Sequence, residues 1–434
     1  MSFNDFAFND HIAGAIKRCG FTIPTPIQQQ ALGAVLARRD MLGLAQTGTG
    51  KTAAFALPTI QHLMESKAAS AAGRPRALII APTRELAEQI NEFVRTVIAG
   101  TPLRSLSVYG GVGKPGQVER IRRGVDLIVA CPGRLLDLLN DRVVDLGGIE
   151  TLILDEADHM FDKGFLPDIR RILRQVPKKR QTLVFSATMP DEIRHLAEDI
   201  LTDPLTVQIN PTRSVDAITH RVISVEQSRK TDLLLHLLES DSMTSTLVFA
   251  RTKHKAKGVA QKLAQAGFRA TSLQGNLSQN RRQQALDGFK DGTFTVLVAT
   301  DIAARGIDVA GISHVVNYDM PDTAEAYIHR TGRTGRASCT GEALNFATSE
   351  DRRMLMTIER SLSCRMDRRE VTLAPATRQE PAARQEPAAP RTGQRRQGPA
   401  AGKPAAAKPA AAATRRDGRP ARAGVFGLGS RKGR

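Results

Sequence analysis

The chain has 434 residues, a length typical of two domains, and its apolar fraction of 41% is sufficient for hydrophobic cores. A net charge of +18 predicts a polyanionic partner, nucleic acid or an anionic membrane, although charge that serves only solubility gives the same composition. The four cysteines are scattered, which argues against a disulfide framework and a zinc site. Since neither a signal peptide nor an apolar segment of about 18 residues is found, we expect a cytoplasmic protein with no membrane partner.

Short apolar runs alternate with helical stretches along the chain. Such runs are typical of strands buried on both faces of parallel sheets, which helices cover. A polar stretch at 209–217 interrupts the alternation, so we expect two α/β domains, 1–208 and 218–370, joined by a linker at 209–217. The predicted strands lie at 41–44, 77–81, 125–130, 151–155 and 182–186 in the first domain, and at 246–250, 295–300 and 314–318 in the second.

The last part of the chain, 371–434, has a different composition. It is rich in Ala, Pro, Gly and Arg, contains a tandem RQEPAA repeat at 378–389, and has one aromatic residue, Phe426. Residues 375–434 carry a net charge of +11, from fourteen Lys and Arg and three Asp and Glu. Such a segment cannot bury enough apolar surface to fold, so we expect a disordered basic tail that is attracted loosely to phosphates.

A glycine-rich segment, AQTGTGKT at 45–52, stands between a predicted strand and a helical stretch. It nearly matches the P-loop pattern G-x-x-x-x-G-K-[ST], with alanine in place of the first glycine. Gly48 and Gly50 would let backbone N–H groups face phosphate oxygens at the start of a helix. Lys51 would then reach the β- and γ-phosphates, and the Thr52 hydroxyl would ligate Mg²⁺. A chance GKT in a turn is the alternative, but the flanking strand and helix favour a phosphate site.

Three carboxylates follow the predicted strand at 151–155, in the sequence LILDEADHMF. A strand of the same sheet would place Asp155 beside the P-loop, where it would hold Mg²⁺ through water. Glu156 follows at a position suited to polarising the attacking water. Helix capping is the alternative and fits Asp158 in part, but it leaves the P-loop unexplained.

These motifs, with YIHRTGRTGR at 327–336, make the chain resemble the DEAD-box ATP-dependent RNA helicases, superfamily 2 proteins with two RecA-like domains. The resemblance runs from Phe3 to about residue 370, and the basic tail makes the chain most similar to the bacterial RhlE-type branch. It implies RNA-stimulated ATP hydrolysis coupled to local, non-processive opening of short RNA duplexes or to remodelling of RNA–protein complexes. An ATP-gated RNA clamp with little unwinding and a DNA helicase are the alternatives.

The resemblance also assigns a nucleotide site that binds ATP and Mg²⁺. Phe21 is expected to stack on adenine, and Gln28 to hydrogen-bond its edge. The other nucleotide-binding residues are Gln46, Thr47, Gly48, Thr49, Gly50, Lys51, Thr52, Gly306 and Asp308. The metal residues are Thr52 and Asp155, largely through water. The catalytic residues are Lys51, Asp155, Glu156, His329, Arg333 and Arg336, the last two as arginine fingers.

RNA is the partner that the resemblance implies, held through its sugar–phosphate backbone and tethered by the tail, with ribosome-assembly or RNA-decay proteins as further candidates. The expected RNA contacts are Thr83, Arg84, Gly111, Gly133, Arg134, Arg251, Arg282 and Thr300. The residues expected to couple ATP hydrolysis to strand separation are Asp158, Ser186, Thr188 and Arg330. Family members usually carry threonine where this chain has Cys131. Because neither domain holds a complete site, hydrolysis is expected to need ATP and RNA together.

Overall fold

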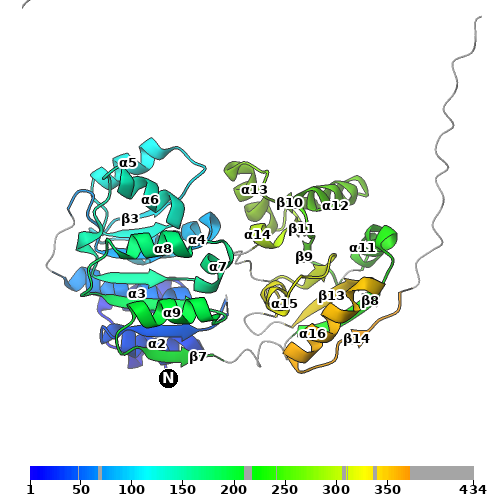
Figure 1. Ribbon diagram of the computed structural model, residues 1–434, viewed down its shortest axis with the longest axis horizontal. Helices are drawn as coiled ribbons and strands as arrows, with labels where there is room; N and C mark the ends of the chain where they lie inside the picture. Colours follow the sequence, from blue (N-terminus) through cyan, green and yellow to red (C-terminus); the bar gives the residue numbers. More distant parts are fainter. Residues whose placement is uncertain are drawn as a thin grey trace, which may run out of the picture. The chain divides into compact units, whose positions relative to one another are not determined.

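The computed structural model describes residues 1–46, 48–66, 71–209, 218–240, 242–304, 309, 311–335 and 340–371. All but the first residue of the predicted linker and all but the first residue of the predicted tail lie outside these ranges. The description therefore covers a first lobe, up to residue 209, and a second lobe, from residue 218 (Figure 1). In the part of the chain that is described, no helix is long and apolar enough to cross a membrane.

The first lobe is built on a seven-stranded parallel sheet with the order β3-β4-β2-β5-β6-β1-β7. Its strands are β1 (Met41–Leu44), β2 (Ala77–Ile80), β3 (Ser105–Val108), β4 (Leu127–Ala130), β5 (Thr151–Leu154), β6 (Gln181–Ser186) and β7 (Leu205–Gln208). Its helices are α1 (Asp10–Arg18), α2 (Pro26–Leu36), α3 (Lys51–Glu65), α4 (Arg84–Ile98), α5 (Lys114–Arg122), α6 (Pro132–Asn140), α7 (Ala157–Asp162), α8 (Leu166–Leu173) and α9 (Asp191–Ile200).

The apolar runs form strands because both faces of the sheet are covered. In β2, Ala77 and Ile79 belong to a core shared with helices α1 to α4, whereas Leu78 and Ile80 belong to a core shared with helices α5 to α9. Side chains of a strand alternate between faces, so a run without polar residues needs a helical layer on each side. The predicted doubly covered parallel sheet is confirmed.

The second lobe repeats this plan with a parallel sheet of order β10-β11-β9-β12-β13-β8-β14. Its strands are β8 (Ile218–Ser224), β9 (Thr246–Phe249), β10 (Ala270–Leu273), β11 (Val296–Ala299), β12 (His314–Asn317), β13 (Gly341–Ala347) and β14 (Asp367–Arg368). Its helices are α11 (Lys230–Leu238), α12 (Lys253–Gln265), α13 (Gln279–Lys290), α14 (Asp301–Ala304), α15 (Ala324–Thr331) and α16 (Arg352–Leu362). Short 3-10 helices lie at Phe3–Asp5, Leu146–Gly148, Gln227–Arg229 and Ser349–Asp351.

Among the strands of the described residues, six were not predicted from the sequence, namely β3, β7, β8, β10, β13 and β14. Four of them, β3, β7, β10 and β14, are the outermost strands of the two sheets. An edge strand is covered less completely, so it tolerates polar residues and loses the continuous apolar run. The other two, β8 and β13, carry the buried polar residues His220 and Asn345.

Candidate active site

The glycine-rich turn that precedes α3 has the backbone geometry of a phosphate cradle. Gly48 and Gly50 adopt left-handed conformations, with φ of 85° and 91°. A Cβ atom at Gly50 would lie 2.6 Å from Nε2 of Gln28, so only glycine fits here without displacing that side chain. Lys51, the first residue of α3, is buried, and its Nζ donates to the carbonyl oxygen of Ala45 at 2.9 Å. Backbone N–H groups at the start of α3 and a lysine are thus presented together.

Two acidic residues follow the end of β5 and reach the same turn. Oδ1 of Asp155 lies 3.9 Å from Nζ of Lys51, although β5 and β1 are separated in the sheet by β6. Burial raises the pKa of Asp155 to about 6, against the opposing effect of the Lys51 charge. Glu156 has a left-handed backbone conformation with φ of 53°, which is rare outside glycine. This conformation sets the direction of its side chain at the start of α7.

Glu156 is held by His159, which was not among the predicted site residues. Nδ1 of His159, one turn along α7, hydrogen-bonds to Oε2 of Glu156 at 2.8 Å. Burial alone would raise the pKa of Glu156, but this hydrogen bond and the neighbouring positive charges lower it below its ordinary value. Glu156 is therefore an ionised, oriented carboxylate. The spacing of three residues within a helix was the sequence signal for this pair.

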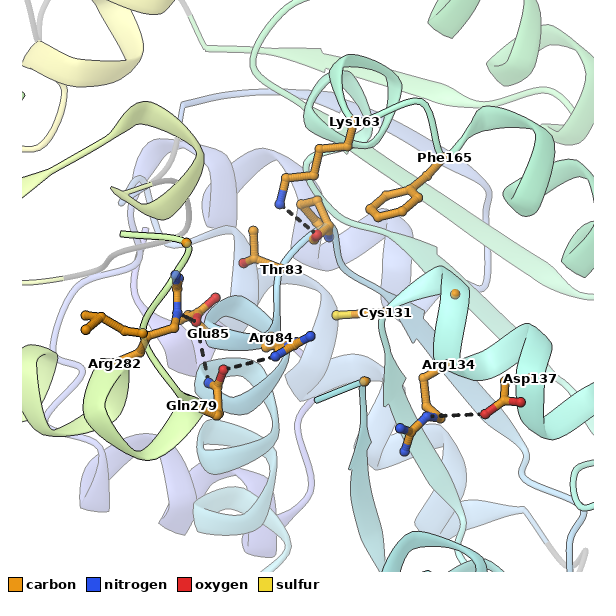
Figure 2. A pocket seen from close by; sticks show the side chains of 15 residues that line it. Thr83, Arg84, Glu85, Cys131, Arg134, Asp137, Lys163, Phe165, Gln279 and Arg282 are labelled. Atoms are coloured by element: carbon orange, nitrogen blue, oxygen red, sulfur yellow. Dashed lines mark hydrogen bonds and ion pairs between the residues drawn. The ribbon is translucent and has the colours of Figure 1, made fainter. Parts of the chain in front are cut away.

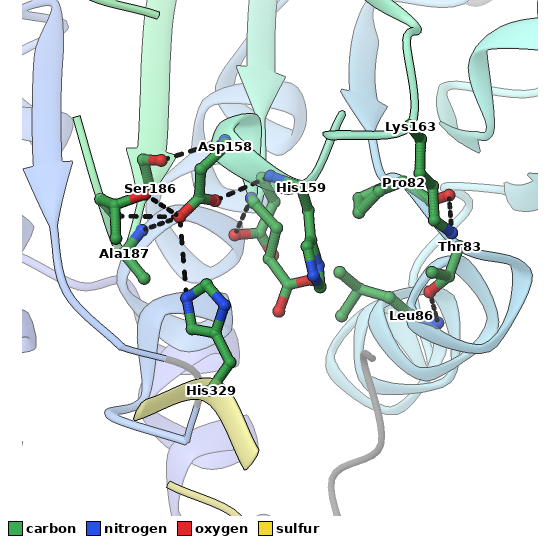
Figure 3. A network of polar contacts seen from close by, with 12 residues as sticks. Pro82, Thr83, Leu86, Asp158, His159, Lys163, Ser186, Ala187 and His329 are labelled. Carbon is green, nitrogen blue, oxygen red and sulfur yellow. Dashed lines mark hydrogen bonds and ion pairs between the residues drawn. The ribbon is translucent and has the colours of Figure 1, made fainter. Parts of the chain in front are cut away.

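A third carboxylate, Asp158, joins three segments of the chain (Figure 3). Its Oδ2 accepts hydrogen bonds from the backbone N–H of Ala187 at 3.1 Å, the N–H of Thr188 at 2.9 Å and the Thr188 hydroxyl at 3.0 Å. Its own N–H donates to Oγ of Ser186 at 3.1 Å. Nε2 of His329, from α15 of the second lobe, lies 4.0 Å from the same Oδ2. Burial opposes ionisation, but the charges of His329 and Lys51 lower the pKa of Asp158.

A cavity of about 540 Å³ opens beside these residues. Phe21, Gln28, Lys51, Asp155 and Glu156 all line it, as do Thr52 and Gly50. The Gln28 amide is fixed at both ends, because its Oε1 accepts from the N–H of Thr25 at 2.9 Å and its Nε2 donates to Gly50 at 3.0 Å. An amide, an aromatic ring, a lysine and two carboxylates thus meet around a space of the size that small-molecule sites have.

A second cavity, of about 610 Å³, is lined by basic side chains of both lobes (Figure 2). Arg84 and Arg134 line it from the first lobe, together with Thr83 and Gly133. Arg282 lines it from α13 of the second lobe. Gly111 has φ of 83°, a conformation that favours glycine, and a Cβ atom there would lie 2.1 Å from Nη1 of Arg84 and would displace that side chain.

Each arginine of this second cavity has a polar partner. Arg282 Nε donates to Oε1 of Glu85 at 2.8 Å, and Arg84 Nη1 donates to the Gln279 amide oxygen at 3.4 Å. Arg134 Nε lies 3.4 Å from Oδ2 of Asp137. The partners Glu85 and Gln279 were not identified from the sequence, since almost 200 residues separate them from the side chains that they meet.

In the second lobe, Arg330 of α15 is buried in the core of the lobe. Its Nε and Nη2 donate to the two carboxylate oxygens of Asp301 at 2.5 and 2.7 Å, and its Nη1 donates to Asn317 at 2.9 Å. Arg330 therefore fixes α15 to the start of α14, directly after Thr300. The neighbouring Arg333 is also buried, and its charge lowers the pKa of Glu156. Arg251 differs, because its side chain is 54% exposed and lies 3.3 Å from Asp322.

Comparison with known proteins identifies the family. Residues 25–196 match the DEAD/DEAH box helicase model, and residues 229–338 match the helicase conserved C-terminal domain. The DEAD-box ATP-dependent RNA helicase CshA of Bacillus subtilis is 41% identical over 378 residues, which cover 87% of this chain and 76% of CshA. The chain belongs to the DEAD-box RNA helicases. It is an ATP-dependent RNA helicase and hence an ATP-hydrolysing enzyme.

Solved structures of DEAD-box proteins share the fold of both lobes. S. cerevisiae Dbp5 bound to RNA and ADP BeF3 has a TM-score of 0.76 and 32% identity, and the similarity covers 85% of this chain and 95% of that one. The DEAD-box helicase Mss116 bound to ssRNA and UDP-BeF has a TM-score of 0.77 and 26% identity, over 86% of this chain and 80% of that one. The prediction of two RecA-like domains is thereby confirmed.

Some residues that were assigned to the helicase site from the sequence cannot be placed. Thr47, Gly306, Asp308 and Arg336 lie outside the described residues. Gln46 and Thr49 lie inside the phosphate turn, where the Thr49 hydroxyl donates to the carbonyl oxygen of Gln46 at 2.8 Å.

Proposed function

We propose that this helicase hydrolyses ATP in response to RNA, and that it uses the cycle to open short duplexes locally or to remodel RNA–protein complexes. The observation that carries the proposal is the position of Asp158. This carboxylate lies two residues from Glu156, accepts three hydrogen bonds from Ala187 and Thr188, and faces His329 of the second lobe. Movement of the second lobe would therefore act on the segment that bears the catalytic carboxylates.

The first lobe would carry out the chemistry. Lys51 would leave the Ala45 carbonyl and neutralise the phosphates. Glu156, oriented by His159, would accept a proton from water as its oxygen bonds to the γ-phosphorus, and the bond from that phosphorus to the ADP oxygen would break. Asp155 and Thr52 line the cavity with the oxygen atoms that Mg²⁺ prefers, so we assign them to hold this ion through water. The ion would supply further positive charge at the β- and γ-phosphates.

The adenine and ribose would be bound at the two ends of the same site. We assign Phe21 to stack on the adenine and the Gln28 amide to recognise its edge, which the fixed orientation of that amide supports. Gly306 and Asp308 are assigned to the ribose side on the family resemblance alone. The remaining nucleotide contacts are assigned to the phosphate turn, at Gln46, Thr47, Gly48, Thr49 and Gly50.

The second lobe would complete the transition-state site. Arg333 is assigned as an arginine finger, and its effect on the pKa of Glu156 supports this role. Arg336 is assigned as the second finger on the family resemblance alone, and His329 is assigned to the contact with Asp158. Such arginines stabilise the charge on the γ-phosphate and can raise the rate by about 10³–10⁵.

RNA would occupy the second cavity. Phosphate oxygens would replace the partners of Arg84, Arg134 and Arg282, because a guanidinium group binds a phosphate as readily as a carboxylate or an amide oxygen. The other proposed backbone contacts are Thr83, Gly111, Gly133, Arg251 and Thr300. Contacts to the RNA backbone carry no sequence information. Aromatic residues make up only 4% of the chain, which disfavours a processive motor that steps along stacked bases.

Coupling between the two cavities would pass through two groups of residues. Ser186 and Thr188 contact Asp158 on the ATP side. Arg330 ties α15, which carries His329, to Asp301, the neighbour of the proposed RNA contact Thr300. RNA at Thr300 and ATP at Asp158 would thus act on the same helix, and we assign Arg330 to this coupling.

The basic tail would tether RNA without sequence preference, as its charge of +11 over residues 375–434 supports. This layout is also the support for the RhlE-type branch, whereas the B. subtilis relative is named CshA. Proteins of ribosome assembly or RNA decay are proposed as further partners, and the cytoplasm as the location.

Steady-state ATP hydrolysis by the full chain tests the proposal, measured without nucleic acid and then with RNA or DNA of equal length. Glu156→Gln controls for contaminating ATPases. Stimulation by RNA alone, lost in the variant, is the expected result, whereas equal stimulation by DNA would contradict it. Unwinding of a short duplex is measured in parallel, because long-lived RNA complexes without strand separation would favour the ATP-gated clamp.

A further inference from the structure

The turn that follows α7 lies on the second cavity. We propose that Lys163 and Phe165, at 163–165 of this turn, form a further RNA contact in which Lys163 binds a backbone phosphate and Phe165 packs against the adjoining nucleotide. The inference rests on the proposed function, because it assumes that RNA occupies this cavity. It adds a contact at the C-terminal end of the short helix α7, whose N-terminal end is capped by the catalytic carboxylate Glu156.

Both side chains line the cavity beside residues already proposed to bind RNA (Figure 2). Lys163 reaches from the end of α7 towards Thr83, and its Nζ donates to the carbonyl oxygen of Pro82 at 3.1 Å (Figure 3). Both Lys163 and Phe165 are half-buried, so one side of each packs on the lobe while the other faces the cavity. Gly164, with φ of 71°, provides the turn that brings them together.

The chemistry of the lining favours a nucleotide over a simple anion. The cavity presents four cationic side chains, those of Arg84, Arg134, Lys163 and Arg282, against the two carboxylates Glu85 and Asp137. Among the residues that line it, Phe165 is the aromatic one. An excess of positive charge suits a phosphodiester, and a flat apolar ring beside it suits a base or ribose, which a free phosphate lacks.

The position of Lys163 in the chain gives the contact a second consequence. Glu156 is the N-terminal cap of α7 and Lys163 is its C-terminal cap, so the two residues lie at opposite ends of one helix of six residues, about 9 Å long. Binding of Lys163 to an RNA phosphate in place of the Pro82 carbonyl would therefore change the contacts at the end of α7 opposite Glu156, which would join RNA binding to hydrolysis within the first lobe.

Four variants of the full chain test this inference, with single-stranded RNA affinity measured by fluorescence over a range of salt concentrations. Lys163→Met removes the charge, Lys163→Arg restores it, and Phe165→Leu removes the ring. Lys178→Met is the matched control, since Lys178 is an exposed lysine just after α8 and lies outside the cavity.

Lys163→Met is expected to weaken RNA binding about 3- to 10-fold and to reduce the slope of log affinity against log salt by about 0.7. Lys163→Arg should retain most of the affinity and the slope. Phe165→Leu should weaken binding about 5-fold or more with the slope unchanged, because stacking involves no counterion release. The RNA concentration that half-stimulates ATP hydrolysis should rise in step for both variants.

Equal affinity and slope for Lys163→Met and Lys178→Met would overturn the inference. So would a weaker affinity with an unchanged slope and a lower melting temperature, because Lys163 would then only hold the Pro82 carbonyl in place. Failure of the proposed function is distinct from either outcome, because the unmodified chain would then show no preference for RNA over DNA in binding or in ATP hydrolysis.

Discussion

The two cavities are built on opposite principles. Around the first, Asp155, Glu156 and Asp158 are 2%, 4% and 5% exposed, and each is held by hydrogen bonds or by a buried cation. Around the second, Arg84 and Arg282 rest on partners from the other lobe, Gln279 and Glu85. Chemistry needs groups that are fixed before the ligand arrives, whereas a grip on RNA needs groups that can exchange partners.

The largest effect is expected at the fixed site. Glu156→Gln keeps the shape of the side chain and its contact to His159 but removes the carboxylate that would accept a proton. RNA-stimulated ATP hydrolysis should fall by about 10²–10⁴ in kcat, while RNA binding stays close to that of the unmodified chain. Steady-state kinetics and RNA titration measure the two quantities. A variant that keeps the normal kcat would show that another group acts as the base.

The next effect sharpens the contrast within the second lobe. Arg330→Met removes a buried guanidinium, so that the Asp301 carboxylate and the Asn317 amide oxygen lose the donor they accept from. The unfolding free energy of the lobe should therefore fall by about 3 kcal/mol. Arg251→Met, at an arginine whose side chain is 54% exposed, is the control and should change it by less than about 1 kcal/mol. Denaturant unfolding measures both free energies. Equal losses for the two variants would contradict the distinction between the buried Arg330 and the exposed Arg251.

A third effect concerns pH, because β8 buries a histidine. Nδ1 of His220 hydrogen-bonds to the Tyr327 hydroxyl at 2.7 Å, and burial lowers the pKa of His220 to about 4, from an ordinary value of 6.5. The unfolded chain therefore takes up a proton that the folded lobe excludes. Stability that the neutral ring contributes is present above pH 6.5 and is lost as the pH falls towards 4.

The variant that tests this is His220→Asn, whose amide can still hydrogen-bond to Tyr327. On acidification from neutral pH it should lose about 1–3 kcal/mol less of its unfolding free energy than the unmodified chain. Denaturant unfolding at several pH values measures the difference. Parallel curves for the two proteins would mean that His220 is protonated in the folded lobe.

The smallest effect is expected in the exchangeable cavity, at Cys131. Burial raises the pKa of this thiol to about 12, so it is neutral and a weak hydrogen-bond donor. Cys131→Thr places a hydroxyl at the same point, and RNA affinity should rise about 2- to 5-fold through one better hydrogen bond. RNA titration measures the change. Unaltered affinity would mean that RNA does not reach this position.

The sequence was most informative where structure and chemistry are local. Continuous apolar runs located β2, β4 and β5, because both faces of these strands are buried. The phosphate turn and the carboxylates after β5 were found because each motif occupies a few consecutive residues. Edge strands such as β3 were not predicted, because their polar residues alternate with apolar ones and the sequence therefore resembles a loop.

What the sequence did not reveal depends on contacts between distant residues. Arg282 meets Glu85 across 197 positions, and Arg330 meets Asp301 across 29, so neither partner is marked by spacing. The buried polar residues of β8 and β13 also broke the apolar pattern, since Asn345 is satisfied only by Asn317 and other groups that the fold brings to it. Tertiary hydrogen bonds stabilise such strands, and local sequence propensity does not predict them.

The central claim is that ATP and RNA bind to one coupled system, and RNA affinity measured with and without a non-hydrolysable ATP analogue tests it most directly. Because coupling free energy is reciprocal, the analogue should tighten RNA binding by the same factor by which RNA tightens binding of the analogue. We expect a factor of about 10 or more, reduced in Asp158→Asn. Equal RNA affinity with and without the analogue would contradict the account.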